Sequence, residues 1–255
     1  MRTSIRTVAF ATTAVSLALL GTACSSGEAG DSGKGSAAPS ASATSASAAP
    51  AARTLSDAEL EKAIVEKADL KGHQVQKAGA GDVVPAAEVT TDKASCAPIA
   101  HAMSFISPGS PAATAERQVI EVPKKDATAA PEDALLGALG SQMSAVTLGA
   151  YEGQGAQEAL ASVKKAGAEC AGGFTVTHKA EKTKVRKVVT ESFTAGEEAA
   201  AFTLTSDLEG EAFVSKLVVF RQGNTLASFS TVSFVPGGVK EFPKAVIDAQ
   251  AKKLG

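Results

Sequence analysis

The spacing of apolar residues along the chain predicts five helices. In the first, Leu60 and Ile64 lie one helical turn apart, and Ser56 with Glu59 forms the capping-box pattern that starts a helix. The third begins at Pro131, because proline followed by two acidic residues suits a first helical turn. The predicted helices cover residues 56–68, 95–105, 131–143, 156–169 and 239–254.

Alternating apolar and polar residues predict strands, most of them in the last third of the chain. Within residues 184–193, this alternation places Val185, Val189 and Phe193 on one face. Residues 222–224 separate two such runs and are expected to form a short hairpin loop around Gly223. The predicted strands cover residues 73–77, 116–122, 146–151, 173–178, 184–193, 198–206, 212–221 and 225–235.

The order of these elements predicts an α+β fold. Consecutive strands joined by short loops form antiparallel sheets, and helices with one apolar stripe need a sheet face to cover. We therefore expect a largely antiparallel sheet of about five strands that ends in a meander near the C-terminus. The helices are expected to pack on one face of this sheet.

The N-terminal residues resemble an export signal. Arg2 and Arg6 precede an apolar run over residues 8–20, which is too short to span a bilayer and typical of a signal peptide. Small residues then lead to Cys24, as in a bacterial lipobox, although Gly21 stands where an aliphatic residue is usual. We predict a signal peptide over residues 1–23 and lipidation of Cys24. The alternative is an ordinary secretory signal in which Cys24 is incidental.

A tether and one domain are expected to follow. Residues 25–52 consist mostly of Ala, Ser and Gly and contain no Val, Ile, Leu or Phe, so they cannot bury an apolar core. Residues 24–52 therefore form the predicted lipidated, disordered tether, and residues 53–255 a single globular domain. The composition resembles that of actinobacterial exported proteins, which places the lipid anchor on the extracytoplasmic face of the cell membrane.

Two cysteines remain once Cys24 is assigned to the lipid. Cys96 and Cys170 would both reach an oxidising compartment, where a disulfide is the default expectation. The alternative is a nucleophilic Cys96 assisted by His101. On a helix, two residues at this spacing point about 140° apart, which favours the disulfide.

Composition and motifs exclude several functions. The net charge of −2 leaves no overall basic footprint for nucleic acid, and the absence of Trp argues against an aromatic ligand platform. Because no nucleophile elbow, phosphate-binding loop or metal-binding motif is found, we expect no catalytic, cofactor-binding or metal-binding residues. The three histidines, which lack metal-ligand spacing, are His73, His101 and His178.

Basic residues gather around one predicted hairpin, at positions 179–187. These residues could contact anionic headgroups or a wall polymer, and they are Lys179, Lys182, Lys184, Arg186 and Lys187. The alternative is a sheet edge that lysines protect against aggregation.

Several short segments together are similar to actinobacterial extracytoplasmic lipoproteins. They also resemble the external sensor-type domain of mycobacterial receptor Ser/Thr kinases, over most of residues 55–253. This resemblance implies a disulfide-containing α+β fold and a ligand-sensing role, with no ligand named. The chain departs from the kinase pattern in having one candidate disulfide rather than two, no tryptophan and no kinase part. The segments are residues 60–75, Ser95-Cys96-Ala97-Pro98, Ala150-Tyr151-Glu152-Gly153, Cys170 and Phe220-Arg221-Gln222-Gly223-Asn224.

The expected function is a membrane-anchored, non-enzymatic binding or interaction module outside the cell. Its expected partners are the membrane, through the Cys24 lipid, and an unidentified ligand, wall polymer or protein. One alternative is a lipid or glycolipid carrier with an apolar cavity of several hundred Å³. A second is a wall hydrolase that uses Asp207, Glu209 and Glu211, since glycoside hydrolysis needs paired carboxylates.

Overall fold

The computed structural model describes residues 53–79, 81–123, 140–235 and 237–255. The predicted signal peptide, Cys24 and the predicted tether all lie outside these residues, as does most of the helix expected over 131–143. Of that expected helix, residues 140–143 are described and not helical, and Met143 begins a strand.

A nine-stranded antiparallel sheet forms the centre of the part of the chain that the structure describes. The strand order is β1-β3-β4-β9-β8-β7-β6-β5-β2, and β5 to β9 follow one another as a meander. The predicted α+β class, antiparallel sheet and C-terminal meander are therefore confirmed. The strands are β1 His73–Lys77, β2 Val89–Thr91, β3 Ala113–Glu121, β4 Met143–Ala150, β5 Phe174–His178, β6 Glu181–Glu191, β7 Glu198–Leu208, β8 Glu211–Gln222 and β9 Thr225–Val232.

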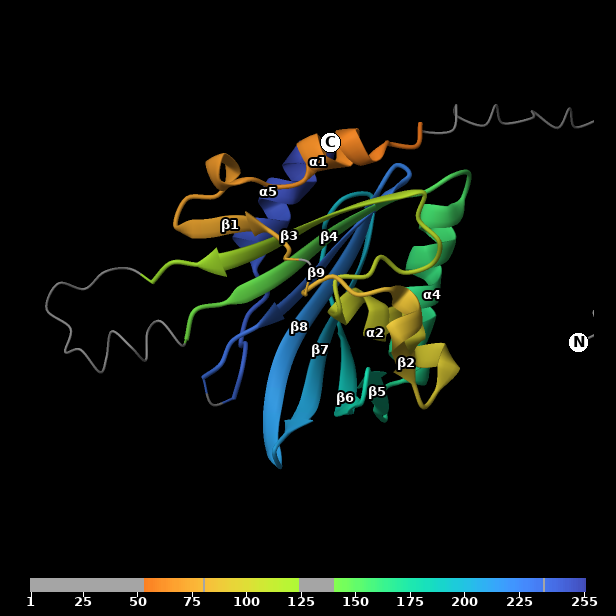
Figure 1. Cartoon of the computed structure of the whole chain (residues 1–255), viewed down its shortest axis with the longest axis vertical. Helices are drawn as coiled ribbons and strands as arrows, with labels where there is room; N and C mark the ends of the chain where they lie inside the picture. The colour runs from red at the N-terminus through yellow and green to blue at the C-terminus, as the bar shows by residue number, and fades with distance from the viewer. Residues whose placement is uncertain (1–52, 80, 124–139, 236) are drawn as a thin grey trace, which may run out of the picture. The chain divides into compact units, whose positions relative to one another are not determined.

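Four α-helices of the described chain pack against this sheet (Figure 1). The first begins as predicted, because the Glu59 carboxylate accepts a hydrogen bond from the Ser56 backbone N–H at 2.9 Å. It ends earlier than residue 68, and the backbone N–H of Val65 donates instead to Gln250 Oε1. The helices are α1 Asp57–Ala63, α2 Ala97–Met103, α4 Gly155–Glu169 and α5 Lys244–Leu254, and short 3₁₀ turns lie at Lys67–Asp69, Ala86–Glu88 and Ala94–Cys96.

The helices cover both faces of the sheet, which corrects the expectation of one covered face. In β8, Leu217 and Val219 pack with α2 and α4, whereas Val218 and Phe220 pack with α1 and α5. Successive residues of a strand point to opposite faces, so these are two separate cores. Because β8 and β9 are apolar on both faces, neither face of the central sheet can remain in water.

A β-bulge at Arg186 changes which residues of β6 share a face. Val185 pairs with Ser206 and Lys187 pairs with the next residue, Thr205, so Arg186 is an extra residue in β6. As a result, Val185 and Val188 both lie in the core of α2 and α4. The expected regular alternation of residues 184–193 is therefore wrong beyond Val185.

The predicted disulfide joins the two helices of one core. Cys96 ends a 3₁₀ turn that leads into α2, and Cys170 caps the C-terminus of α4. Both residues are fully buried, and their Cα atoms lie 5.9 Å apart. The pairing removes Cys96 as a free nucleophile.

We predict that Cys96→Ser with Cys170→Ser lowers the free energy of unfolding by about 4 kcal/mol. The bridge closes a loop with a sequence separation of 74, and the chain-entropy estimate for such a loop has this size. Denaturant titration of the oxidised chain and of the double variant measures the difference. A reducing agent should destabilise the parent chain and leave the variant unchanged; equal stability of parent and variant would contradict the prediction.

A second prediction concerns the contact between α4 and β7. A Cβ atom at Gly167 would lie 2.2 Å from Cε1 of Phe202, whose ring is buried in the core and cannot retreat. Gly167→Ala should lower the free energy of unfolding by about 1–3 kcal/mol through overpacking. The control is Gly172→Ala, where a Cβ meets nothing within 4 Å, and its change should stay within about 0.5 kcal/mol. A neutral or stabilising Gly167→Ala would show that the helix and the strand can separate at this contact.

Candidate functional site

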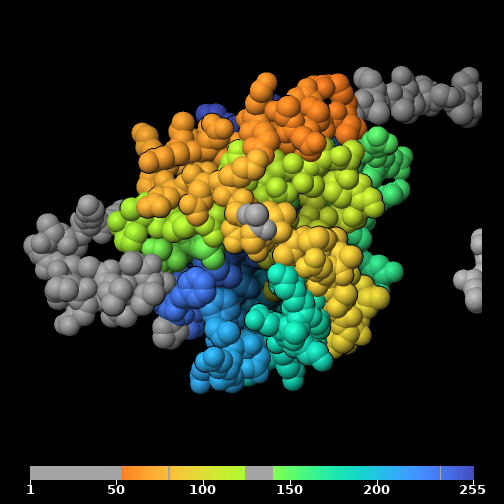
Figure 2. Space-filling model, in the orientation of Figure 1, coloured from red at the N-terminus to blue at the C-terminus, as the bar shows by residue number. Residues whose placement is uncertain are grey.

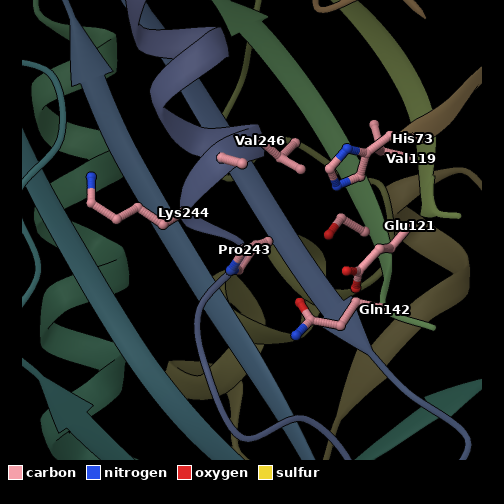
Figure 3. Close-up of a pocket in the computed structure, with 9 residues that line it drawn as sticks. His73, Val119, Glu121, Gln142, Pro243, Lys244 and Val246 are labelled. Carbon is pink, nitrogen blue, oxygen red and sulfur yellow. The ribbon is translucent and has the colours of Figure 1, made fainter. Parts of the chain in front are cut away.

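A small polar pocket lies where β1, β3 and the start of α5 meet (Figure 3). His73 and Glu121 point into it from paired positions of β1 and β3, and Gln142 adds an amide. Lys244 extends away from the pocket and pairs with Asp248 at 2.7 Å. The volume is about 160 Å³.

This pocket is suited to water or a small ion. His73 Nδ1 lies 3.0 Å from the backbone oxygen of Lys71, and no hydrogen bond to Glu121 is found. Typical sites for organic ligands start near 300 Å³. Its polar groups therefore neither form a catalytic pair nor enclose a substrate.

A larger, apolar groove lies at the ends of β7, β8 and β9. We call it the end groove, and its volume is about 260 Å³. Phe234 and Leu208 are 62% and 55% exposed, the highest values among the large apolar residues of the described chain. The ring of Phe213 lies against that of Phe234, with centroids 6.4 Å apart. The lining residues are Leu208, Glu211, Ala212, Phe213, Phe234, Val235 and Gly237.

The strand register explains why these side chains gather. Leu217 pairs with Ser230, and the same register continued four residues outward brings Phe213 opposite Phe234. Both lie on the face that α2 and α4 cover further along the sheet. The β7–β8 hairpin extends beyond α2 and α4 in Figure 1, which agrees with the high exposure of Leu208 at its tip.

The turn at the tip of this hairpin gives the groove an acidic rim. Glu209 and Gly210 both have positive φ, at 52° and 92°, as the central residues of a type I′ turn require. Glu211 lines the groove itself, and no Lys or Arg is among its described lining residues.

A second apolar pocket continues along the same face. Ser230 and Val232 of β9 line it together with Met143 and Phe105, and its volume is about 190 Å³. The alternation of β9 carries this face on to Phe234. The surface of this side of the molecule is hollowed beside the strand ends (Figure 2).

Neither apolar pocket has the volume of several hundred Å³ that a lipid or glycolipid carrier is expected to have. Both are partly open to solvent, and the two other pockets described, beside β1 and beside β5 and β6, have mainly polar linings. The structure therefore adds no support for a lipid or glycolipid carrier.

The carboxylates proposed for hydrolysis do not form a catalytic pair. Asp207 accepts hydrogen bonds from Arg186 and from the backbone N–H of Gly210, and these keep its pKa below the usual value. A carboxyl group held ionised in this way is a poor general acid. Glu211 faces the end groove from β8 instead, and no bond to Asp207 is found.

The three histidines lie apart in the fold. His73 lies in β1, His101 in α2 and His178 at the end of β5. No group of three potential metal ligands is found among the described residues. In the same part of the chain, no helix combines the length and apolar character that crossing a bilayer requires.

The end groove was not among the sites expected from the sequence. Its signal was available, because Leu208 and Phe213 flank a Glu-Gly turn and Phe234 follows the last strand beside Gly237. Large apolar residues next to turns are unusual, since turns lie on the surface. Only the register shows that these residues meet.

Comparison with known proteins gives a fold resemblance only. No protein-family model matches the chain, and no curated protein matches its sequence. Among solved structures, the chain is similar to the extracellular domain of PknH from Mycobacterium tuberculosis, with 11% sequence identity and a TM-score of 0.48. The match covers 79% of this chain and 96% of that one.

Proposed function

We propose that this protein is a lipid-anchored, extracytoplasmic binding module that docks a partner protein in the end groove. The partner segment presents an apolar side chain next to basic residues. The observation that carries the proposal is the pair of highly exposed side chains, Phe234 and Leu208, on either side of an apolar hollow. No enzymatic step is part of this proposal.

The apolar part of the groove supports recognition of a protein. Exposed apolar side chains that gather around one hollow mark interaction sites more often than scattered ones do. The neighbouring rings of Phe213 and Phe234, inclined by 36°, offer an aromatic surface that an aliphatic or aromatic side chain can cover. An anchor of this kind at the centre of an interface supplies most of its binding energy.

The charged rim supports a basic partner. Glu211 lines the groove and Glu209 lies at the adjacent turn, so the surrounding potential attracts Lys and Arg. The same carboxylates repel an anionic membrane surface, which makes insertion of Phe234 into the bilayer the weaker explanation.

The disulfide supports an exported location. Structural disulfides persist in oxidising compartments and are rare in the cytosol. Cys96 and Cys170 are both buried in a core, as a structural bridge requires. The signal peptide over residues 1–23, the lipid on Cys24 and the tether complete the proposed arrangement.

The test of the groove uses a random 12-residue peptide library displayed on phage. The bait is the mature chain with Cys24→Ser, so that no lipid is attached. Selected peptides should carry a large apolar residue beside Lys or Arg. The double variant Leu208→Ser with Phe234→Ser should bind them at least tenfold more weakly, because each lost apolar contact is worth about 1.5 kcal/mol or more.

The matched control for this test is Val122→Ser. Val122 is a large apolar residue that is 38% exposed, and it lies outside the groove at the end of β3. It should leave peptide affinity within twofold. Peptides that bind the groove variant as tightly as the parent chain, or a selection dominated by acidic peptides, would overturn the proposed site.

The anchor makes a separate prediction. In the expressing bacterium, Cys24→Ala should move the protein from the membrane fraction to the soluble exported fraction, because the thiol is the site of lipid attachment. Metabolic labelling with an alkyne fatty acid should mark the parent chain and not the variant. Labelling that survives Cys24→Ala would rule out this attachment site, and an unlabelled parent chain would favour an ordinary secretory signal.

A further inference from the structure

The sheet face opposite the end groove carries a row of lysines. Lys182 and Lys184 of β6 point away from Val185, which lies in the core of α2 and α4. Their partners in β5 are Thr177 and Thr175, so threonines and lysines share this face. We call it the lysine–threonine face and define it as Thr175, Thr177, Lys182, Lys184, Lys187 and Thr205.

The bulge at Arg186 brings Lys187 onto the same face. Without the extra residue, strict alternation would turn Lys187 to the side opposite Lys182 and Lys184. With it, Lys187 pairs with Thr205, two residues from Asp207, the partner of Lys184. The three lysines therefore point the same way.

These lysines are available to a ligand. Lys182, Lys184 and Lys187 are exposed, and no ion pair or hydrogen bond joins their ammonium groups to the described residues. The charge of Lys184 does contribute to lowering the pKa of Asp207. Arg186 differs, because its guanidinium bonds Asp207 at 3.0 Å. On this face of β5 to β7 the charged side chains are Lys182, Lys184, Arg186, Lys187, Asp207 and Glu191, which leaves an excess of positive charge.

No helix of the described chain packs on this part of the sheet. The core of α1 and α5 lies on the same side, yet it includes no residue of β5 or β6 among those described. The strand order also argues against a role in protecting an edge, because β6 lies between β7 and β5, and β2 follows β5. Lys184 thus lies in a part of β6 that is paired on both sides, and the edge explanation considered from the sequence does not apply to it. Among the described strand pairs, Lys182 has a partner in β5 and none in β7. Lys187 lies beyond the last β5 pair, Phe174 with Val185, so the edge explanation stays open for Lys182 and for Lys187.

A polar pocket of about 330 Å³ adjoins the row. Lys184 and Arg186 line it from β6 and Thr175 from β5, and Gly173 allows the chain to approach closely. At Gly173 φ is +89°, and a Cβ atom would lie 2.4 Å from the backbone oxygen of Val185. Asp92 also lines this hollow, and its carboxylate accepts a hydrogen bond from the Thr175 backbone N–H at 2.8 Å. The hollow therefore holds two cationic side chains and one carboxylate, and the exposed lysines of the row carry the excess positive charge.

We propose that the lysine–threonine face binds a linear phosphodiester polymer that carries no bases. Residues two apart in a strand are separated by about 7 Å, and phosphates joined by three-carbon spacers in an extended chain repeat at a similar distance. Each lysine ammonium donates to one phosphate, and the threonine hydroxyls donate to oxygens between them.

Two other anionic ligands, a lipid bilayer and single-stranded nucleic acid, fit this face less well. A bilayer would need large apolar side chains to insert, and the exposed Leu208 and Phe234 lie on the opposite face. Single-stranded nucleic acid would need aromatic rings for base stacking. Among the described residues of β5 to β7, Phe174 and Phe202 are both buried in the core of α2 and α4.

The experiment measures binding of fluorescent poly(glycerol phosphate) to the mature Cys24→Ser chain by anisotropy at 50 and 300 mM NaCl. The parent chain should bind at low salt and weaken at high salt, because binding releases counterions. Lys182→Gln, Lys184→Gln and Lys187→Gln together should reduce affinity at least tenfold and flatten the salt dependence. Unchanged thermal unfolding would show that the triple variant is folded, as expected for exposed side chains.

The matched control removes the same charge elsewhere. Lys62, Lys67 and Lys252 are exposed, have no ion pair, and lie in α1, a 3₁₀ turn and α5. Their combined change to Gln should alter affinity less than twofold. Equal losses in both triple variants would overturn the proposal, as would absence of binding by the parent chain. Tighter binding of phosphatidylglycerol vesicles or single-stranded DNA than of the polymer would also overturn it.

Discussion

The structure depends on a pair of central strands that are apolar on both faces. In β8 and β9, neighbouring residues such as Val218 and Val219, or Leu226 and Ala227, are all fully buried. Each face must be removed from water, so α2 with α4 covers one side and α1 with α5 the other. The disulfide links the start of α2 to the end of α4, and thereby keeps these two helices together on their face of the sheet.

The same helices are too short to cover the whole sheet, and the two proposed binding surfaces lie in the areas that they leave uncovered. β7 and β8 run for 11 and 12 residues, whereas α2 has only 7. Because successive side chains of a strand point to opposite faces, the same strands present apolar residues in one uncovered area and charged residues in the other. Leu208 and Phe213 face the end groove, while Asp207 and Lys184 face the other side.

Ion pairs account for most of the carboxylates whose protonation is perturbed. Lys77 and Arg117 lower the pKa of Glu61, Lys164 lowers that of Glu198, and Arg186 lowers that of Asp207. In each case the partner lies on another element, so the carboxylate ties a helix or a strand to its neighbour. These acids stay ionised at neutral pH and serve the fold and its charge pattern.

The sequence by itself determined the local elements and the covalent link. Alternating apolar and polar residues located β5 to β9, and the capping box located the start of α1. The count of cysteines paired Cys96 with Cys170. These predictions were possible because each depends on residues close in sequence or on a small number of possible partners. Only the tertiary structure decided that both faces are covered and that a bulge at Arg186 turns Lys187 toward Lys184. The meeting of Phe213 with Phe234 was also decided there. The register of a strand, the position of a bulge and the area of sheet that a helix covers all depend on contacts between residues distant in sequence. A local sequence pattern does not encode these contacts.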